Sequence, residues 1–229
     1  MPAEEIGVGF QQEQSIAEKL SSLRKNNVFA RFALSLSGLY FVVTGIQYWM
    51  PDYLRQVFGA TEEVIAWYYS ALTFTGPISG VVIGGIVTSK LGGYNDHRAQ
   101  KVLRMVCFGA VAVCIPSPLV NSIEVYCTLL WLLLFFGGFI LPPLTGIMLS
   151  SVENQQKASA NSLANLAYNA FGYFPSPIFY GLVSQISGGG SSRWPMGCLL
   201  YSTMLTISFL RPALDEVIRK REEVSFRER

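Results

Sequence analysis

The stretch from 84 to 103, GGIVTSKLGGYNDHRAQKVL, gathers the residue types in this sequence that could most readily do chemistry. Its two glycine pairs and Lys90 could cradle a phosphate, and His97, the single histidine of the chain, could bind a metal ion. A phosphate loop requires GxxxxGK[ST], but Gly85 is followed by IVTSKLGG and no GK[ST] occurs. His97 has no partner ligands at metal-binding spacing, so we interpret it as a solvated side chain in a short turn.

Other reactive side chains are equally isolated. All four cysteines lie inside hydrophobic runs and form no CxxC or Cys/His pattern: Cys107, Cys114, Cys127 and Cys198. They are interpreted as small packing residues, so neither a metal, a disulfide nor a cofactor is expected. No hydrophobic segment carries paired carboxylates, a histidine cluster or an activated nucleophile, and an enzyme is therefore not expected.

Composition indicates a membrane protein. Of 229 residues, 51% are hydrophobic and only 14% are charged, and the mean hydropathy is +0.36. An ordinary soluble surface needs about 25% charged residues. The net charge of +2, without clusters of basic and aromatic residues, gives no sign of nucleic-acid binding. The lipid bilayer is therefore the first expected partner.

Six segments are apolar and long enough to cross a bilayer, which takes about 20 residues. They are residues 28–50, 64–88, 102–120, 124–150, 159–186 and 194–211. If both ends of the chain are cytosolic, the cytosolic segments hold 15 of the 17 Lys and Arg residues, and only Arg55 and Arg193 lie outside. Because cytosolic flanks carry the excess of basic residues, this orientation is predicted.

The expected fold is thus an all-α membrane protein with six transmembrane helices. Residues 1–27 form a polar cytosolic lead-in, residues 28–211 the six-helix bundle, and residues 212–229 a charged cytosolic tail.

Polar side chains recur at helical spacing in two spans. Asn161, Asn165 and Asn169 follow one another every four residues in the fifth span, and they cover an arc of about 80°. Asn165 and Asn169 are candidates for lining a substrate path, and hydrogen bonding between helices is the alternative. In the first span, Ser37, Tyr40, Thr44, Gln47 and Tyr48 form a second stripe, of which the last three are further candidates. Anchoring at the membrane boundary is the alternative for Tyr48.

Glycines and prolines mark places where helices could bend or approach closely. Gly138 and Pro142 lie on one face of the fourth span, and Pro175 and Pro177 interrupt the fifth. They are hinge or packing candidates, since neighbouring helices can satisfy the freed backbone groups. In the second span, Gly76, Gly80 and Gly84 have the small-xxx-small spacing of helix packing.

No charged residue is expected near the middle of a span. The charges between Arg31 and Lys90 lie in the outer loop, and Glu124 lies at the outer edge of the fourth span. A proton relay or an anion-pairing arginine would need such a group. We therefore expect facilitated transport, or coupling through groups elsewhere.

The turn that opened this section resembles the GxxxD[RK]xG[RK][RK] motif between the second and third helices of each half of the major facilitator superfamily. Gly85, Lys90 and Gly92 match it, and Ser89 stands in the aspartate position. The basic pair of the motif is absent, and a positive charge appears later in the turn, at Arg98. Because Ser89 lacks a carboxylate, Asp96 is a candidate to take over the role of the motif's aspartate.

The resemblance extends over about residues 25–212 and is to the C-terminal six-helix half of such a transporter. It implies a 3+3 inverted repeat, alternating access around a central site, and an N-terminal half on the same or a separate chain. YWMP at 48–51 and FPSPI at 174–178 look most like Spinster-type lysolipid carriers. The implied function is transport of a small organic or amphipathic solute, a lysolipid among them. A non-transporting membrane subunit that uses the bundle as an interaction platform is the alternative.

Overall fold

The computed structural model describes residues 26–94, 96–189 and 191–227, and regular structure in these ranges is helical throughout. The longer helices are α2 (Asn27–Phe58), α3 (Glu62–Lys90), α4 (His97–Cys114), α5 (Ile123–Ser150), α6 (Lys157–Tyr168), α7 (Pro175–Ile186), α8 (Trp194–Tyr201) and α9 (Thr203–Arg227). Short segments are η1 (Ser117–Leu119), η2 (Asn154–Gln156) and η3 (Asn169–Tyr173). Nearly all of the predicted lead-in, residues 1–25, lies outside the described residues.

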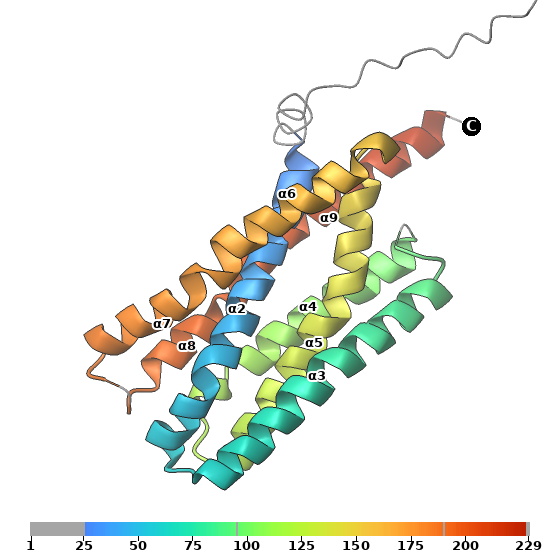
Figure 1. Ribbon diagram of the computed structural model, residues 1–229. Coiled ribbons are helices and arrows are strands. Elements are labelled where there is room, and N and C mark those ends of the chain that lie inside the picture. The colour runs from blue at the N-terminus through green and yellow to red at the C-terminus, as the bar shows by residue number, and fades with distance from the viewer. Residues whose placement is uncertain (1–25, 95, 190, 228–229) are drawn as a thin grey trace, which may run out of the picture.

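Five helical stretches of the described chain are long and apolar enough to cross a membrane: Asn27–Phe58, Glu62–Lys90, His97–Leu119, Ile123–Ser150 and Trp194–Arg219. The fifth predicted span, 159–186, is instead divided into α6, η3 and α7, which follow one another along one line (Figure 1). The sixth is interrupted at Ser202, and its second part continues as α9 to Arg227, through the predicted boundary between bundle and tail. The expected all-α membrane fold is confirmed.

The ends of α2 follow from local sequence. Asn26 caps its start, because the Asn26 side chain accepts hydrogen bonds from the backbone amides of Val28 and Phe29. The helix passes Pro51 and ends where Gly59 adopts a left-handed conformation, with φ of 64°. It therefore runs eight residues beyond the predicted end of the span at 50.

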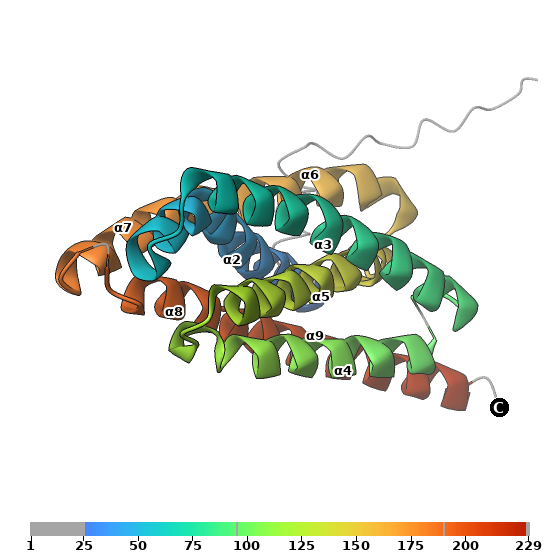
Figure 2. The same ribbon diagram turned by 90° about the horizontal axis from the view of Figure 1, so that it is seen from below.

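The bundle has three layers (Figure 2). The first holds α3 and the α6–α7 line, the middle layer α2 and α5, and the third α4, α8 and α9. The contacts agree, since α3 packs on α5, α6 and η3 pack on α2, and α9 packs on both α2 and α4. The helices of the two successive triplets thus occupy matching layers, which is the arrangement that a 3+3 repeat requires.

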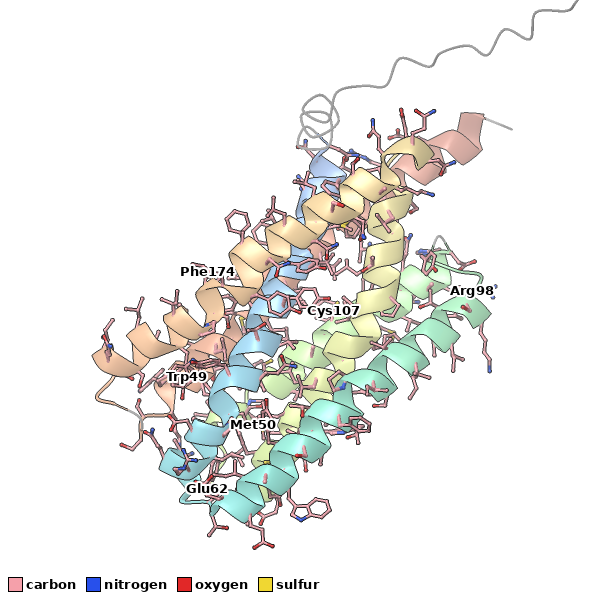
Figure 3. The ribbon with its side chains drawn as sticks, viewed as in Figure 1. Trp49, Met50, Glu62, Arg98, Cys107 and Phe174 are labelled. Carbon is pink, nitrogen blue, oxygen red and sulfur yellow. The ribbon has the colours of Figure 1, made fainter. Side chains whose placement is uncertain are left out.

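Two hydrophobic cores lie along the bundle, and α2 and α5 contribute to both. One contains Phe32, Leu36, Leu144 and Leu214 and lies toward the end that carries Asn26, the turn at 91–94 and the C-terminal part of α9. We call this the basic end. The other contains Met50, Tyr53, Leu130 and Leu199. Arg98 and Glu62 mark the two opposite ends of the molecule (Figure 3).

A glycine seam holds α3 against α5. A Cβ atom added at Gly80 would lie 2.1 Å from the carbonyl oxygen of Phe135, and one at Gly84 would lie 2.5 Å from that of Phe139. From the other side, a Cβ at Gly138 would lie 2.4 Å from the carbonyl oxygen of Pro77. Backbones this close gain dispersion contacts, which drive helix association where lipid removes the hydrophobic effect. Gly138, a predicted hinge or packing residue, therefore lies in a tight helix contact.

Replacing Gly80 by Ala is expected to destabilise the protein by about 1–3 kcal/mol, because the new methyl group overlaps backbone atoms of α5 that cannot rotate away. Gly85→Ala is the matched control, since a Cβ there meets nothing within 4 Å. Thermal unfolding in detergent, followed by circular dichroism, measures both. Equal melting temperatures for the two variants would contradict the seam.

Candidate functional site

The candidate site is an open face on α2, bordered by α3 and α5 on one side and by α6, η3 and α7 on the other. Three of the residues predicted to line a substrate path lie along it. Thr44 is half-buried, Gln47 is exposed, and Tyr48 is 64% exposed. The Thr44 hydroxyl is enclosed and has no hydrogen-bond partner among the described residues. A buried hydroxyl without a partner is costly, and because this one is enclosed, it is not accessible from the open face.

The Trp49 side chain points toward α7 and links α2 to that helix. Its indole Nε1 donates to the carbonyl oxygen of Pro177 at 3.1 Å, and its ring stacks on Tyr180 with centroids 4.5 Å apart. Pro177 thus supplies a carbonyl oxygen to the contact between the two helices. Beside it, the Ser176 hydroxyl donates to the carbonyl oxygen of Phe41 at 2.5 Å.

The asparagine amides donate along their own helix. The Asn165 Nδ2 donates to the carbonyl oxygen of Asn161 at 2.9 Å, and the Asn169 Nδ2 donates to that of Asn165 at 2.7 Å. None of the hydrogen bonds found in the described chain joins either amide to another helix. Both amides therefore keep their side-chain oxygens available as acceptors.

Helical geometry places these amides at the rim of the open face. Tyr168 of α6 contacts Tyr40 of α2, with ring centroids 4.4 Å apart. Asn165 and Asn169 lie about 60° and 100° further round the helix, away from the buried Ala164. Asn165 is half-buried and Asn169 is exposed.

A π turn breaks the fifth span at Asn169–Tyr173. The amide of Phe174 donates to the carbonyl oxygen of Asn169, five residues earlier, at 3.0 Å. Pro175 follows directly and has no N–H for the carbonyl four residues before it, which favours a local change of helix type. The predicted hinge residues Pro175 and Pro177 thus lie at the start of α7, just beyond this irregular turn.

The π turn brings Tyr173 onto the same patch as Tyr168. On a regular α-helix, residues five apart would point about 140° away from each other. Here the Tyr173 ring stacks on Tyr40 at 4.9 Å, and the ring centroids of Tyr168 and Tyr173 lie 6.1 Å apart. Close approach of backbones makes this possible, because a Cβ at Gly172 would lie 2.7 Å from the carbonyl oxygen of Ser37. The sequence interpretation did not identify Tyr168 or Tyr173, and the position of Tyr173 depends on a change of helical period that it did not include.

Aromatic residues of α5 and α3 form the other border. The Trp131 Nε1 donates to the hydroxyl of Thr75 at 2.7 Å, and its ring stacks on Phe135 at 5.6 Å. The Tyr69 hydroxyl donates to the carbonyl oxygen of Gln47 at 3.0 Å, which ties α3 to α2. The side chains named on and around this face are aromatic, amide or hydroxyl groups without formal charge.

The glycine motif forms the turn between α3 and α4. Gly92 and Gly93 have φ of 97° and 88°, and the amide of Gly93 donates to the carbonyl oxygen of Thr88 at 2.9 Å. These left-handed conformations require glycine, and they stop α3. Gly85 lies within α3 beside open space. Ser89 and Lys90, the last residues of α3, are exposed.

Asp96 and Tyr94 give this turn its contacts. The Asp96 carboxylate accepts from the amide of Arg98 at 2.7 Å, so Asp96 caps α4. The ring of Tyr94 lies against Gly146 of α5, where an added Cβ would come within 2.7 Å of it. Arg98 is exposed, and Pro142 lies half-buried inside α5 a turn before Gly146.

Comparison with known proteins identifies the family. The sequence model of the Major Facilitator Superfamily matches residues 2–177. The chain belongs to this superfamily. Its members are transporters rather than enzymes, and the predicted fold, half of a major facilitator bundle, is confirmed together with its integral membrane character.

Among curated proteins, the cis,cis-muconate transport protein of Acinetobacter baylyi is 28% identical over 169 residues, which cover 73% of this chain and 38% of that protein. Among solved structures, a bacterial homologue of the human lysosomal transporter Spinster, inward-facing and unoccupied, superposes with a TM-score of 0.75 at 13% identity, over 96% of this chain and 53% of that one. The occupied form gives a TM-score of 0.67 at 16% identity, over 84% and 50%.

The predicted resemblance to Spinster-type carriers is therefore confirmed as a likeness of fold. The chain spans about half the length of the solved structures it matches.

Within this major facilitator half, the Trp131 to Thr75 hydrogen bond is expected to contribute about 0.6 kcal/mol to stability, the average for such bonds between membrane helices. A double-mutant cycle with Trp131→Phe and Thr75→Val, followed by thermal unfolding, measures the coupling. Trp67→Phe is the control, because Trp67 is 75% exposed. Strictly additive effects of the first two changes would contradict the bond.

Proposed function

We propose that this chain carries a small organic or amphipathic solute across the membrane by alternating access, with the open face as one half of the substrate path. The observation that supports this most is a strip of uncharged polar and aromatic groups on an inner helix of the bundle. Exposed polar groups on a membrane helix are costly in lipid, so they mark a cavity or a partner. Family membership supports transport as the use of that cavity.

The second wall would be an N-terminal six-helix half, on the same or a separate chain. The helices beside the open face expose large apolar side chains. Phe74 of α3 is 71% exposed, Phe171 of η3 is 64% exposed, and Phe174, which projects from the bundle in Figure 3, is 73% exposed. A partner bundle resting on these residues would enclose the strip between them. The half-length match to solved transporters supports the same arrangement.

The chemistry of the face favours an amphipathic solute. Tyr40, Tyr173 and Trp131 offer ring faces to apolar groups, while Asn165 and Asn169 offer amide oxygens to hydroxyl or amine donors. A lysolipid combines both requirements, and the fold likeness to a Spinster homologue supports testing it first.

The orientation proposed from charge is compatible with the fold. The start of α2, the turn that follows α3 and the C-terminal part of α9 all lie at the basic end (Figure 1). The two basic residues predicted to lie outside are at the opposite end of the bundle: Arg55 lies in the last turn of α2, and Arg193 directly precedes α8. The basic end would face the cytosol.

Uptake of labelled lysolipid, compared with labelled sugars, by vesicles that contain the complete carrier tests this proposal. The double variant Asn165→Leu with Tyr48→Leu is expected to lose at least about tenfold in uptake, because it removes an amide acceptor and a ring from the face. The matched control is Asn154→Leu with Tyr201→Leu, since Asn154 lies in η2 and Tyr201 in α8, away from the face. Uptake retained in the first variant would refute the assignment.

Glu124→Gln is expected to leave the pH dependence of uptake unchanged. Glu124 lies in the first turn of α5 and accepts a hydrogen bond from the Ser122 hydroxyl at 2.5 Å, so it has a local role at the end of a helix. A carboxylate that relays protons during transport would need to lie deeper in the membrane. Uptake measured across a pH series checks this, and a lost or displaced pH response in the variant would contradict it.

A further inference from the structure

A hollow of about 110 Å³ lies between α4 and α9, in the layer opposite α3 and α6 (Figure 2). Its lining includes Arg104, Cys107, Phe108, Ile207, Arg211 and Leu214. With a partner bundle on the open face, this layer would remain in contact with lipid. Its occupant must therefore be able to arrive from the bilayer.

Positive charge dominates the part of the hollow that is nearer the basic end. One Nη of Arg104 pairs with Asp215, but its Nε is buried and has no hydrogen-bond partner among the described residues. Arg211 is exposed on the neighbouring helix, and Lys101 is exposed one turn before Arg104. Glu216, the other carboxylate of this region, pairs with Arg31 of α2 at 3.0 Å.

The hollow changes from basic to apolar along the membrane axis. Phe108 lies one turn beyond Arg104 on α4, and Ile207 lies one turn before Arg211 on the antiparallel α9, so both apolar residues lie further from the basic end. Phe108 is 60% exposed, which is a large ring face beside the hollow. This order, basic groups near the boundary and apolar groups deeper, matches a phospholipid with its headgroup at the interface and its chain in the hydrocarbon.

We propose that this groove binds an anionic phospholipid from the leaflet at the basic end. The phosphate lies between Arg211 and Arg104, whose side chain is 34% exposed, and one acyl chain lies along Phe108 and Ile207. Arginine suits this task, because its planar guanidinium offers several donors to phosphate oxygens. Basic pockets between helices at the membrane boundary recognise such headgroups. The bound lipid would bridge α4 and α9 beside the Arg104 to Asp215 pair.

Native mass spectrometry of the detergent-purified carrier, titrated with phosphatidylglycerol or phosphatidylcholine, tests the proposal. Phosphatidylglycerol is expected to be retained in preference. Arg211→Gln should weaken it about fivefold, the usual effect of one basic residue at an anionic membrane surface. Arg219→Gln is the control, since Arg219 lies two turns further along α9 and pairs with Glu223 at 3.9 Å. Equal losses in both variants, or equal retention of the two lipids, would overturn the proposal.

A second measurement locates the lipid independently of Arg211. In a Phe108→Trp variant, brominated phosphatidylglycerol should quench the added fluorescence more than brominated phosphatidylcholine does. Displacement of the lipid by the same concentration of inorganic phosphate would show a small-anion site and overturn the proposal. The assay requires no transport, so its failure and a failure of the uptake experiment are distinguishable.

Discussion

The hydrocarbon core of a bilayer offers no hydrogen bond to a backbone amide or carbonyl, and this constraint shapes the whole chain. Every long segment resolves the constraint by forming a helix. Where a helix is interrupted, the freed groups find partners nearby. At η3 the Asn169 carbonyl oxygen accepts from the Phe174 amide, and at the interruption before α9 the Ser202 amide donates to the carbonyl oxygen of Cys198 at 3.2 Å. Irregular backbone is thus confined to places where the protein itself replaces the missing solvent.

The same environment explains why small residues organise the packing. Lipid chains are as apolar as leucine, so burial against another helix gains little from the hydrophobic effect alone. Close approach at Gly80, Gly84 and Gly138 compensates through backbone contact between α3 and α5. Gly172 does the same for η3 and α2. These two seams lie along the two borders of the open face, and the glycines in them fix how closely the bordering helices approach.

Sequence alone predicted much of this arrangement. Hydropathy located the spans because the bilayer imposes a minimum apolar length, and the spacing of Gly76, Gly80 and Gly84 indicated the seam. The polar stripe of Thr44, Gln47 and Tyr48 was visible because α2 is regular there. Tyr173 could not be placed, since its position depends on a change of helical period that begins at Asn169. The sequence interpretation did not assign Asp96 as the cap of α4, although aspartate is a preferred N-cap residue. Local sequence could not show that Arg104 would meet Asp215 from the far end of the chain.

The π turn also bears on how this family can vary. A π turn contains one residue more than the α-helical turn that it replaces, and it can be viewed as a single-residue insertion into an older, regular helix. Because the π turn has absorbed this extra residue, deleting one residue between 169 and 173 would restore a continuous α-helix and leave the direction of the side chains from Pro175 onward nearly unchanged. Tyr180 would then still face Trp49, and Ser176 would still face Phe41. A one-residue gap at 169–173 in an alignment of relatives is therefore compatible with the same packing of α7 on α2.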